Sequence, residues 1–433
     1  DSQAPLAPAA QVVIASAPGS LVVGDTVRLT ALVLGAGGDT LEDRIVVWAS
    51  SDPGVASVSA SGLVSAVSGG DVQISAASEA VAGTVPITAV DPLVATQIFA
   101  GGVSTNSCAI LPGGSVRCWG QNFSGALGLG VSGGVFTVPT PQQAGPIQQV
   151  AVGESHGCSL SQGGAVACWG SNPFGGVGDS TTNIRVLPVN VAGGGGYTEI
   201  GAGVWLSCGI RNGDWVCWGN FSPGSLYPIV VGSGPYHGLR VGEGHGCALR
   251  TDGSAWCFGV GFAGQLGDDG SSYQSTPVAV AGNHHFATLA AGGRHTCGID
   301  SLGGSWCWGA NLGGQLGDGT TATQSHPVAV TGAPAFASIA AGGQHSCGLT
   351  PAGVAWCWGD NSSGQLGDGT TTNRPQPVTI GGTLRFSQLA AGAVHTCGVA
   401  QDGRVYCWGG NYLGSLGDGT TTDRQTPTLV HAS

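Results

Sequence analysis

Short apolar runs separated by glycine-containing turns follow one another along most of the chain, and no helical period of apolar positions appears. Residues 336–378, FASIAAGGQHSCGLTPAGVAWCWGDNSSGQLGDGTTTNRPQPV, show this pattern most clearly. Within them, SCGLT and VAWCW flank a Pro-Ala-Gly turn, which predicts a β-hairpin. A shorter version of this turn is Arg211-Asn212-Gly213-Asp214, and Asn-Gly is the preferred centre of a two-residue hairpin turn. The hydrophobic pattern therefore predicts an all-β chain.

One unit of this kind is repeated seven times between residues 96 and 430, and paired cysteines mark each copy. The first Cys of a pair recurs every 50 residues, except for one step of 39 between Cys208 and Cys247. The third copy lacks the G-Q-L-G-D-G loop altogether, which accounts for the short step, whereas the first copy reads GALGLG there and the second GGVGDS. A fixed period of this size is typical of a solenoid or a propeller. We predict a seven-bladed β-propeller. The cysteine pairs are Cys108 with Cys118, Cys158 with Cys168, Cys208 with Cys217, Cys247 with Cys257, Cys297 with Cys307, Cys347 with Cys357, and Cys397 with Cys407.

Each pair lies on one predicted hairpin, where folding the two strands together brings the cysteines opposite one another. Facing Cβ atoms on neighbouring strands are about 4.5–5.5 Å apart, and a cross-strand disulfide brings them somewhat closer. The alternative is a set of metal sites, but zinc ribbons use cysteines two to four residues apart, and no C-x-x-C occurs in the chain. We therefore predict seven disulfides inside the blades, which points to an oxidising compartment.

The segment before the repeats has a different pattern. Residues 12–91 contain no Cys, and the runs at 22–34, 45–78 and 83–90 alternate and turn like a small β-sandwich. The string W-A-S-S-D-P-G-V-A-S-V-S-x-x-G-L-V resembles the group 2 bacterial immunoglobulin-like domain. In that comparison Trp48 is a core residue and Gly62 a turn between strands. The organisation predicted is a flexible Pro/Ala-rich segment (1–11), an immunoglobulin-like sandwich (12–91) and a propeller (93–433).

Composition narrows the function. The 433 residues include 81 Gly but no Lys, only 8% are charged, and the net charge is −12. Such a chain should not attract phosphate backbones or anionic lipid, so we expect neither nucleic-acid nor direct membrane binding. The start Asp1-Ser2-Gln3-Ala4-Pro5 suggests a mature end left after a leader is removed, or else a trimmed chain. Together with the cysteines, this favours a secreted or cell-surface protein.

The repeats resemble those of the regulator of chromosome condensation family, whose members form seven-bladed propellers. The resemblance rests on A-G-x-x-H-[TS]-C-G-[LI], D-G-x-x-x-C-W-G-x-N and G-Q-L-G-D-G-T-T, as in CWGANLGGQLGDGTT at 307–321. The eukaryotic founder binds chromatin and exchanges nucleotide on a small GTPase, and one exported bacterial relative inhibits β-lactamases. The resemblance implies the fold and a tendency to bind proteins, and it carries over no catalytic residue. Irregular blades one to three are interpreted either as a specialised face or as drift that packing tolerates.

Two recurring polar positions are candidates for chemistry. A His two residues before the first Cys could form a ring that binds a metal or an anion, or could be a structural residue bonded to a turn in its own blade. The Asp of the G-D-G-T loops could be a Ca²⁺ ligand, or could cap its turn and pair with an Arg six residues later. In both cases the structural interpretation is favoured, and no metal or cofactor is assigned. The positions are His156, His245, His295, His345 and His395, with Asn106 and Leu206 in the other copies, and Asp179, Asp268, Asp318, Asp368 and Asp418, with Arg185, Arg374 and Arg424.

Trp residues flank the second Cys in several copies, and we interpret them as core residues in preference to a platform for stacking carbohydrate. Sequons occur at Asn122, Asn220 and Asn361. No hydrolase, zinc-protease, phosphate-loop or dinucleotide motif is present, and no catalytic residue is assigned. The leading hypothesis is a non-enzymatic binding or scaffolding protein that recognises a protein or polymer through the propeller face. The alternatives are a structural subunit of an extracellular assembly and an enzyme acting on polysaccharide or peptide.

Overall fold

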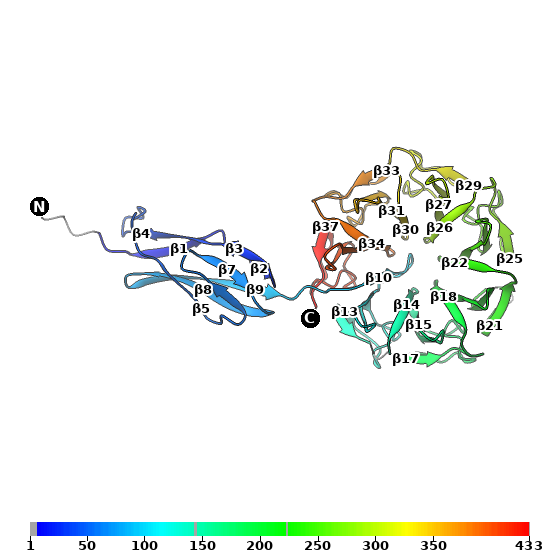
Figure 1. The fold of residues 1–433 in the computed structure, drawn as a ribbon, viewed down its shortest axis with the longest axis horizontal. Coiled ribbons are helices and arrows are strands. Elements are labelled where there is room, and N and C mark those ends of the chain that lie inside the picture. The colour runs from blue at the N-terminus through cyan, green and yellow to red at the C-terminus, as the bar shows by residue number, and fades with distance from the viewer. Residues whose placement is uncertain (1–6, 143–144, 222–223, 433) are drawn as a thin grey trace, which may run out of the picture. The chain divides into compact units, whose positions relative to one another are not determined.

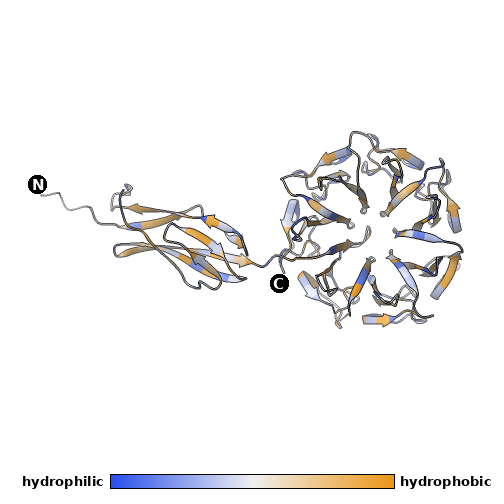
Figure 2. Ribbon diagram, in the orientation of Figure 1, coloured by the Kyte–Doolittle hydropathy of each residue, from blue (hydrophilic) through white to orange (hydrophobic). Residues whose placement is uncertain are grey.

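The computed structural model describes residues 7–142, 145–221 and 224–432. The chain divides into two compact units that meet in sequence between Pro92 and Leu93. All regular secondary structure in the described residues is β, as the sequence predicted (Figure 1). Apolar stretches lie along the strands of both units (Figure 2).

The first unit is an immunoglobulin-like β-sandwich. Its buried core brings together Val64, Ile74 and Ile87 from three strands, and the half-buried ring of Trp48 packs against it. Gly62 has φ +76° in the turn before β7, and a Cβ there would lie 3.0 Å from the Trp48 ring. Both residues have the roles that the sequence predicted. The sheets are β2 (Ser20–Val22), β9 (Val81–Val90), β8 (Gly70–Ser78) and β5 (Val47–Ser50); β3 (Thr26–Arg28), β7 (Leu63–Ala66) and β6 (Ala56–Val58); and β1 (Gln11–Ala15) with β4 (Thr30–Leu34).

Of the N-terminal segment expected to be flexible, residues 1–6 lie outside the described residues. The backbone N–H of Ala10 donates to the carbonyl of Leu34, and β1 begins at Gln11.

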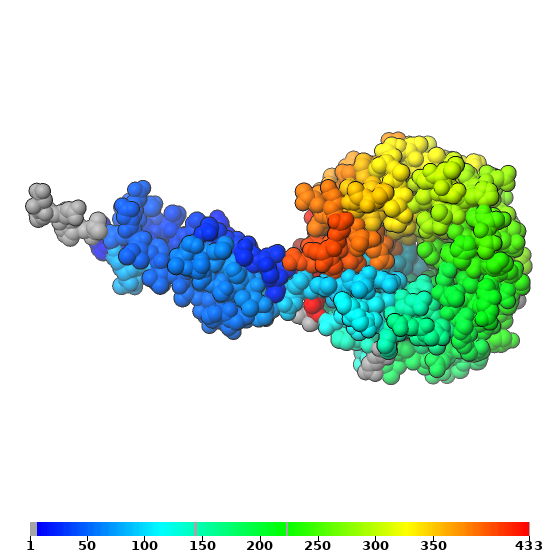
Figure 3. Space-filling model, in the orientation of Figure 1, coloured from blue at the N-terminus to red at the C-terminus, as the bar shows by residue number. Residues whose placement is uncertain are grey.

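The second unit consists of seven four-stranded antiparallel sheets arranged around an axis, in sequence order (Figures 1 and 3). In each sheet, which we call a blade, the first strand is innermost and the fourth is outermost. Blades 1 to 3 are β10 (Gln97–Ala100), β11 (Ser107–Ile110), β12 (Val116–Gln121) and β13 (Val135–Pro141); β14 (Ile147–Val152), β15 (His156–Ser161), β16 (Val166–Gly170) and β17 (Arg185–Asn190); and β18 (Tyr197–Ala202), β19 (Leu206–Arg211), β20 (Asp214–Gly219) and β21 (Ser225–Gly232).

Blades 4 to 7 have the same order. They are β22 (Tyr236–Val241), β23 (His245–Arg250), β24 (Ala255–Gly259) and β25 (Gln274–Ala279); β26 (Phe286–Ala291), β27 (His295–Asp300), β28 (Ser305–Gly309) and β29 (Gln324–Ala329); β30 (Ser338–Ala341), β31 (His345–Leu349), β32 (Ala355–Gly359) and β33 (Arg374–Thr379); and β34 (Phe386–Ala391), β35 (His395–Ala400), β36 (Val405–Gly409) and β37 (Arg424–Leu429).

The cysteines of each pair face one another on the second and third strands of a blade, in the packed interior, where they are at most 3% exposed. All seven pairs are bonded in the structure, with Cα atoms 4.0–4.1 Å apart. In blade 3 the hairpin turn is the two-residue Asn212-Gly213, with φ of 53° and 85°, which confirms the predicted turn type. The disulfides join Cys108 to Cys118, Cys158 to Cys168, Cys208 to Cys217, Cys247 to Cys257, Cys297 to Cys307, Cys347 to Cys357, and Cys397 to Cys407.

The outermost strands are unpaired edges, and every one of them contains proline. Proline cannot donate a backbone hydrogen bond, so these edges are poor templates for pairing with another sheet. The ring closes between blades 7 and 1. Leu93 donates to the carbonyl of Val430 at 2.9 Å, and the side-chain amide of Gln388 exchanges two hydrogen bonds with the backbone of Ile98.

Candidate functional site

The five recurring histidines connect neighbouring blades. Each is at most 2% exposed, and its Nε2 lies 2.8–3.0 Å from a Ser or Thr hydroxyl on the second strand of the next blade. The sequence interpretation placed the partner in the histidine's own blade, and the structure corrects this point while keeping the role structural. The pairs are His156 with Ser207, His245 with Thr296, His295 with Ser346, His345 with Thr396, and His395 with Ser107.

The hydroxyl in each pair fixes the proton on the imidazole. Thr396, for example, donates its own hydrogen to the carbonyl of Gln365 at 2.9 Å, so it can only accept from His345. The histidine is therefore the neutral Nε2–H tautomer. Burial, together with the nearby His295 and His395, lowers the pKa of His345 to about 3, and burial lowers the pKa of His245 to about 4. Imidazoles that donate to a neighbouring blade do not converge on an axial ligand.

The carbonyl that accepts from the hydroxyl belongs to the long loop after the third strand of the preceding blade. At four of these five junctions the same carbonyl also accepts from a buried Trp of the next blade, as when Gln315 O accepts from Ser346 Oγ and Trp358 Nε1, both at 2.9 Å. His, hydroxyl, loop carbonyl and Trp thus form one unit that joins two blades. These hydrogen bonds run between blades and need no ligand, so the unit is part of the scaffold. Nδ1 of His245, His295, His345 and His395 and Nε1 of Trp408 have no hydrogen-bond partner in the described residues.

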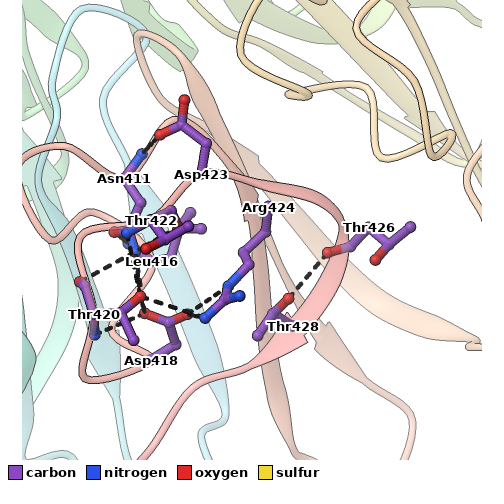
Figure 4. Close-up of polar contacts among 9 residues, drawn as sticks. All are labelled: Asn411, Leu416, Asp418, Thr420, Thr422, Asp423, Arg424, Thr426 and Thr428. Atoms are coloured by element: carbon purple, nitrogen blue, oxygen red, sulfur yellow. Dashed lines mark hydrogen bonds and ion pairs between the residues drawn. The ribbon is translucent and has the colours of Figure 1, made fainter.

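The Asp-Gly-Thr loops are also satisfied internally (Figure 4). Asp418 accepts at Oδ1 from the N–H and hydroxyl of Thr420 at 3.0 and 2.7 Å, and at Oδ2 from Arg424 at 2.8 Å. Asn411 donates to the same carboxylate at 3.1 Å and to the carbonyls of Thr420 and Thr422. Burial raises the pKa of Asp418, but the hydrogen bonds from Thr420 and Arg424 outweigh it, so the net shift is downward.

This loop geometry matches the predicted turn cap and Asp–Arg pair. Asp368 pairs with Arg374 and Asp179 with Arg185 in the same way. Across the described ranges, no group of three or more His, Cys, Asp or Glu side chains is placed to hold a metal ion. The sequon asparagines Asn122 and Asn361 are fully buried, whereas Asn220 is exposed.

The tryptophans divide into two sets. Those after the second Cys, such as Trp308 and Trp358, are fully buried, which confirms the interpretation as core. Those before it, such as Trp306 and Trp356, are half-buried, and Trp306 Nε1 donates to Asp300 at 2.8 Å.

A feature that the sequence interpretation missed is a ring of exposed apolar side chains on one face of the propeller. Each of these residues lies just after the third strand of its blade, one or two positions beyond the end of the segment that corresponds to C-W-G-x-N. Their side chains are 48–80% exposed. Because all the third strands run in the same direction, these loops share one face. Blade 6 has Ser362 there and blade 3 lacks the loop. We call Phe123, Phe174, Phe262, Leu312 and Tyr412 the apolar ring.

The missing loop of blade 3 leaves a notch in this face. β20 ends at Gly219 and β21 begins at Ser225, and Phe221 of the short link packs edge-on against Phe258 of blade 4 at 6.3 Å. The notch contains a hollow of about 370 Å³, whose lining includes Trp205, Phe262 and Tyr273. The Arg294–Glu243 ion pair, 2.9 Å long, also lines the hollow.

Comparison with known proteins agrees with this architecture. The bacterial Ig-like domain (group 2) model matches residues 8–89. Two models of the regulator of chromosome condensation (RCC1) repeat match the propeller, one at 252–299, 303–349, 352–399 and 402–433, the other at 147–175, 336–365 and 386–415. The propeller belongs to the RCC1 repeat family. The RCC1 propeller of this chain therefore follows a bacterial Ig-like domain, as the sequence resemblance implied.

Solved structures share the RCC1 fold at low identity. Prp20p from Saccharomyces cerevisiae, whose structure is described with its binding to Gsp1p and histones, is 24% identical over 73% of this chain and 85% of its own, with a TM-score of 0.65. Human WBSCR16 is 22% identical over 73% and 93%, with a TM-score of 0.67. No curated protein shows a significant match to the chain. The described residues contain no helix long and apolar enough to cross a membrane.

Proposed function

We propose that this chain is an extracellular, non-enzymatic binding protein whose propeller recognises a protein partner through the face that carries the apolar ring. The observation that supports the proposal is the exposure of large apolar side chains at one repeated position. The fold does not need them, because Ser362 occupies the same position in blade 6. Large apolar side chains exposed together on one face are typical of protein interfaces.

The rest of the chain supports the same role. A rigid disc of disulfide-linked blades holds variable loops at fixed positions, which suits recognition. The Asp and His positions that were candidates for chemistry are engaged in scaffold hydrogen bonds. Seven disulfides suit an oxidising, extracellular setting. The bacterial Ig-like domain would then act as a spacer or docking module.

The test compares the native chain with a Phe262→Ser, Leu312→Ser and Tyr412→Ser triple variant. The matched control is Leu302→Ser, which removes an apolar side chain that is 94% exposed in the turn between β27 and β28. Each tagged protein is cross-linked in its native setting, and the partners are identified by mass spectrometry. We expect one defined protein partner with the native chain and the control, and at least about tenfold less of it with the triple variant.

Recovery of the same partner in equal amount with the triple variant would overturn the proposal. Light scattering at about 10 μM measures whether the chain self-associates, which distinguishes the proposed binding protein from a structural subunit of an assembly. A monomer supports recognition of a different protein. Self-association that the triple variant does not change would place the chain in an assembly held by another surface, and so count against the proposal.

A further inference from the structure

The centre of the propeller holds a second hollow, on the axis between the innermost strands (Figure 3). Its volume is about 580 Å³, and innermost strands of all seven blades contribute to its wall. Much of the wall consists of small residues, and the polar ones include Gln97, Gln148, Thr288, Ser338 and Ser387. A cavity of this size falls in the range of small-molecule sites.

A loop from blade 1 covers one end of this hollow. The pair Ala100↔Ser107 encloses residues 101–106, whereas the matching pair in blade 2, Val152↔Gly157, encloses only 153–156. The longer loop reaches the opposite side of the ring. A Cβ on Gly102 would lie 2.9 Å from the carbonyl oxygen of Ala341 and 3.0 Å from the Cα of Gly292, in blades 6 and 5, so only glycine fits. The hollow is therefore a cup, with this loop as its floor.

Arg240 is the one charged side chain among the described residues that line the cup. It faces the first Cys of its blade in the register Arg240↔Cys247. The matching positions in the other blades hold Phe99, Ala151, Gly201, Ala290, Ala340 and Ala390. Arg240 is exposed, whereas three of those alanines are less than 10% exposed, so the longer side chain reaches the water inside the cup.

The guanidinium of Arg240 is only partly engaged. Its Nη1 donates to the carbonyl of Leu239 at 2.8 Å, and no carboxylate in the described part of the chain lies within ion-pair distance of it. Glu199 is near enough to attract it, but its two oxygens accept from the N–H groups of Gly238 and Leu239 at 2.9 and 2.6 Å. The surrounding channel walls partly desolvate the guanidinium at the edge of the cup, which lowers the pKa of Arg240, and Glu199 opposes that shift. A guanidinium that forms no ion pair and reaches the water of the cup favours an anionic ligand.

Three departures from the repeat thus meet in one cavity: the long floor loop, Arg240 and the aromatic Phe99. We propose that the cup binds a monocarboxylate with a compact apolar body, whose carboxylate contacts Arg240 and whose body lies against Phe99 and the alanine wall. The carboxylate can belong to a free small acid or to the C-terminus of a peptide. The cup is lined by the innermost strands and not by the apolar-ring loops, so this inference is independent of the proposed function.

The test titrates the whole chain with phenylacetate, and with its neutral analogue phenylacetamide, by calorimetry at neutral pH. We expect phenylacetate to bind and Arg240→Gln to weaken it by about tenfold or more, because the charge-assisted contact is lost. The matched control is Arg385→Gln, since the Arg385 guanidinium also donates to backbone carbonyls but does not line the cup. Ser338→Trp, at an exposed position of the cup wall, should also weaken binding by narrowing the cup.

A second titration separates the two sources of the carboxylate. Dipeptides ending in phenylalanine are compared with a free and with an amidated C-terminus. Binding of the free-acid peptide, with loss in Arg240→Gln, assigns the cup to chain ends, whereas binding of phenylacetate alone assigns it to small acids. The inference is overturned if neither acid binds, if phenylacetamide binds as well as phenylacetate, or if Arg240→Gln and Arg385→Gln behave alike.

Discussion

Replacing Thr396 by Val tests whether the histidine–hydroxyl pairs hold the blades together. Valine keeps the shape of threonine but removes the hydroxyl that joins blades 6 and 7. The buried Nε2–H of His345 then has no acceptor, and the carbonyl of Gln365 loses a donor. Leaving one such group unsatisfied costs about 1–3 kcal/mol, so we expect the free energy of unfolding to fall by about 2–6 kcal/mol.

The chain itself supplies the control. Serine occupies the matching position in blades 1, 3 and 6, where Ser107, Ser207 and Ser346 accept from a histidine. Thr396→Ser therefore keeps the hydroxyl and loses only a methyl group, at a cost of about 1 kcal/mol. Guanidinium unfolding followed by tryptophan fluorescence measures both variants. Equal stability of the Val and Ser variants would refute the idea that the hydroxyl joins the blades.

Three further predictions follow from the same contacts. Because the folded-state pKa of the five buried histidines is about 3 to 4, below the unfolded value of about 6.5, unfolded chains bind more protons in acid. The contribution of these histidines to the free energy of unfolding should be present above pH 6.5 and should fall by about 2 kcal/mol per histidine at pH 5. A free energy of unfolding that stays constant between pH 7 and pH 5 would contradict this. Mass spectrometry without reductant should find no free thiol, and replacing Cys347 and Cys357 by Ala should cost about 2.5–3 kcal/mol in a denaturant titration. Phe258→Trp should destabilise blade 4 by about 1–3 kcal/mol, because blade 3 lacks the loop whose carbonyl accepts from the corresponding Trp in other blades. An unchanged midpoint of denaturant unfolding would contradict this.

The fold was predictable because each blade repeats its own local signals. The Cys spacing of ten residues brackets a hairpin, and the hairpin fixes which residues face inward, as Trp308 and Trp358 show. The step of 39 residues also located the missing loop of blade 3 correctly. These features depend on contacts between residues of the same repeat, so the repeating sequence pattern is enough to predict them.

The partners of the histidines were not predictable in the same way, because they lie one repeat away. His345 meets Thr396, 51 residues along the chain, through packing between blades that no local pattern specifies. A signal was nevertheless present. Where the histidine is replaced by Asn106 or Leu206, the next blade has glycine in place of the hydroxyl, at Gly157 and Gly246.

The apolar ring and the cup escaped the sequence interpretation because each depends on tertiary placement. An apolar residue such as Leu312 reads as core in a linear pattern, and only the structure shows it to be 80% exposed. In the sequence nothing distinguishes Arg240 from the other eleven arginines, and only the structure shows that it lies on an innermost strand and lines the cup. Positions that repeat from blade to blade are structural, whereas positions that differ between blades include the candidate binding residues.

The junction of blades 3 and 4 shows that such departures are matched to one another. Blade 3 lacks the loop whose carbonyl accepts from a hydroxyl and a Trp of the next blade at other junctions, and blade 4 lacks both donors. Phe258 stands in place of the Trp, and Gly246 stands in place of the hydroxyl residue. Phe258 is fully buried against Trp215 at 5.0 Å, so the junction is closed by aromatic contacts. A loop lost by drift would leave unsatisfied donors in blade 4, at about 1–3 kcal/mol each. The notch beside Trp205 is therefore matched by the residues of blade 4, which bury no donor that would need the missing loop.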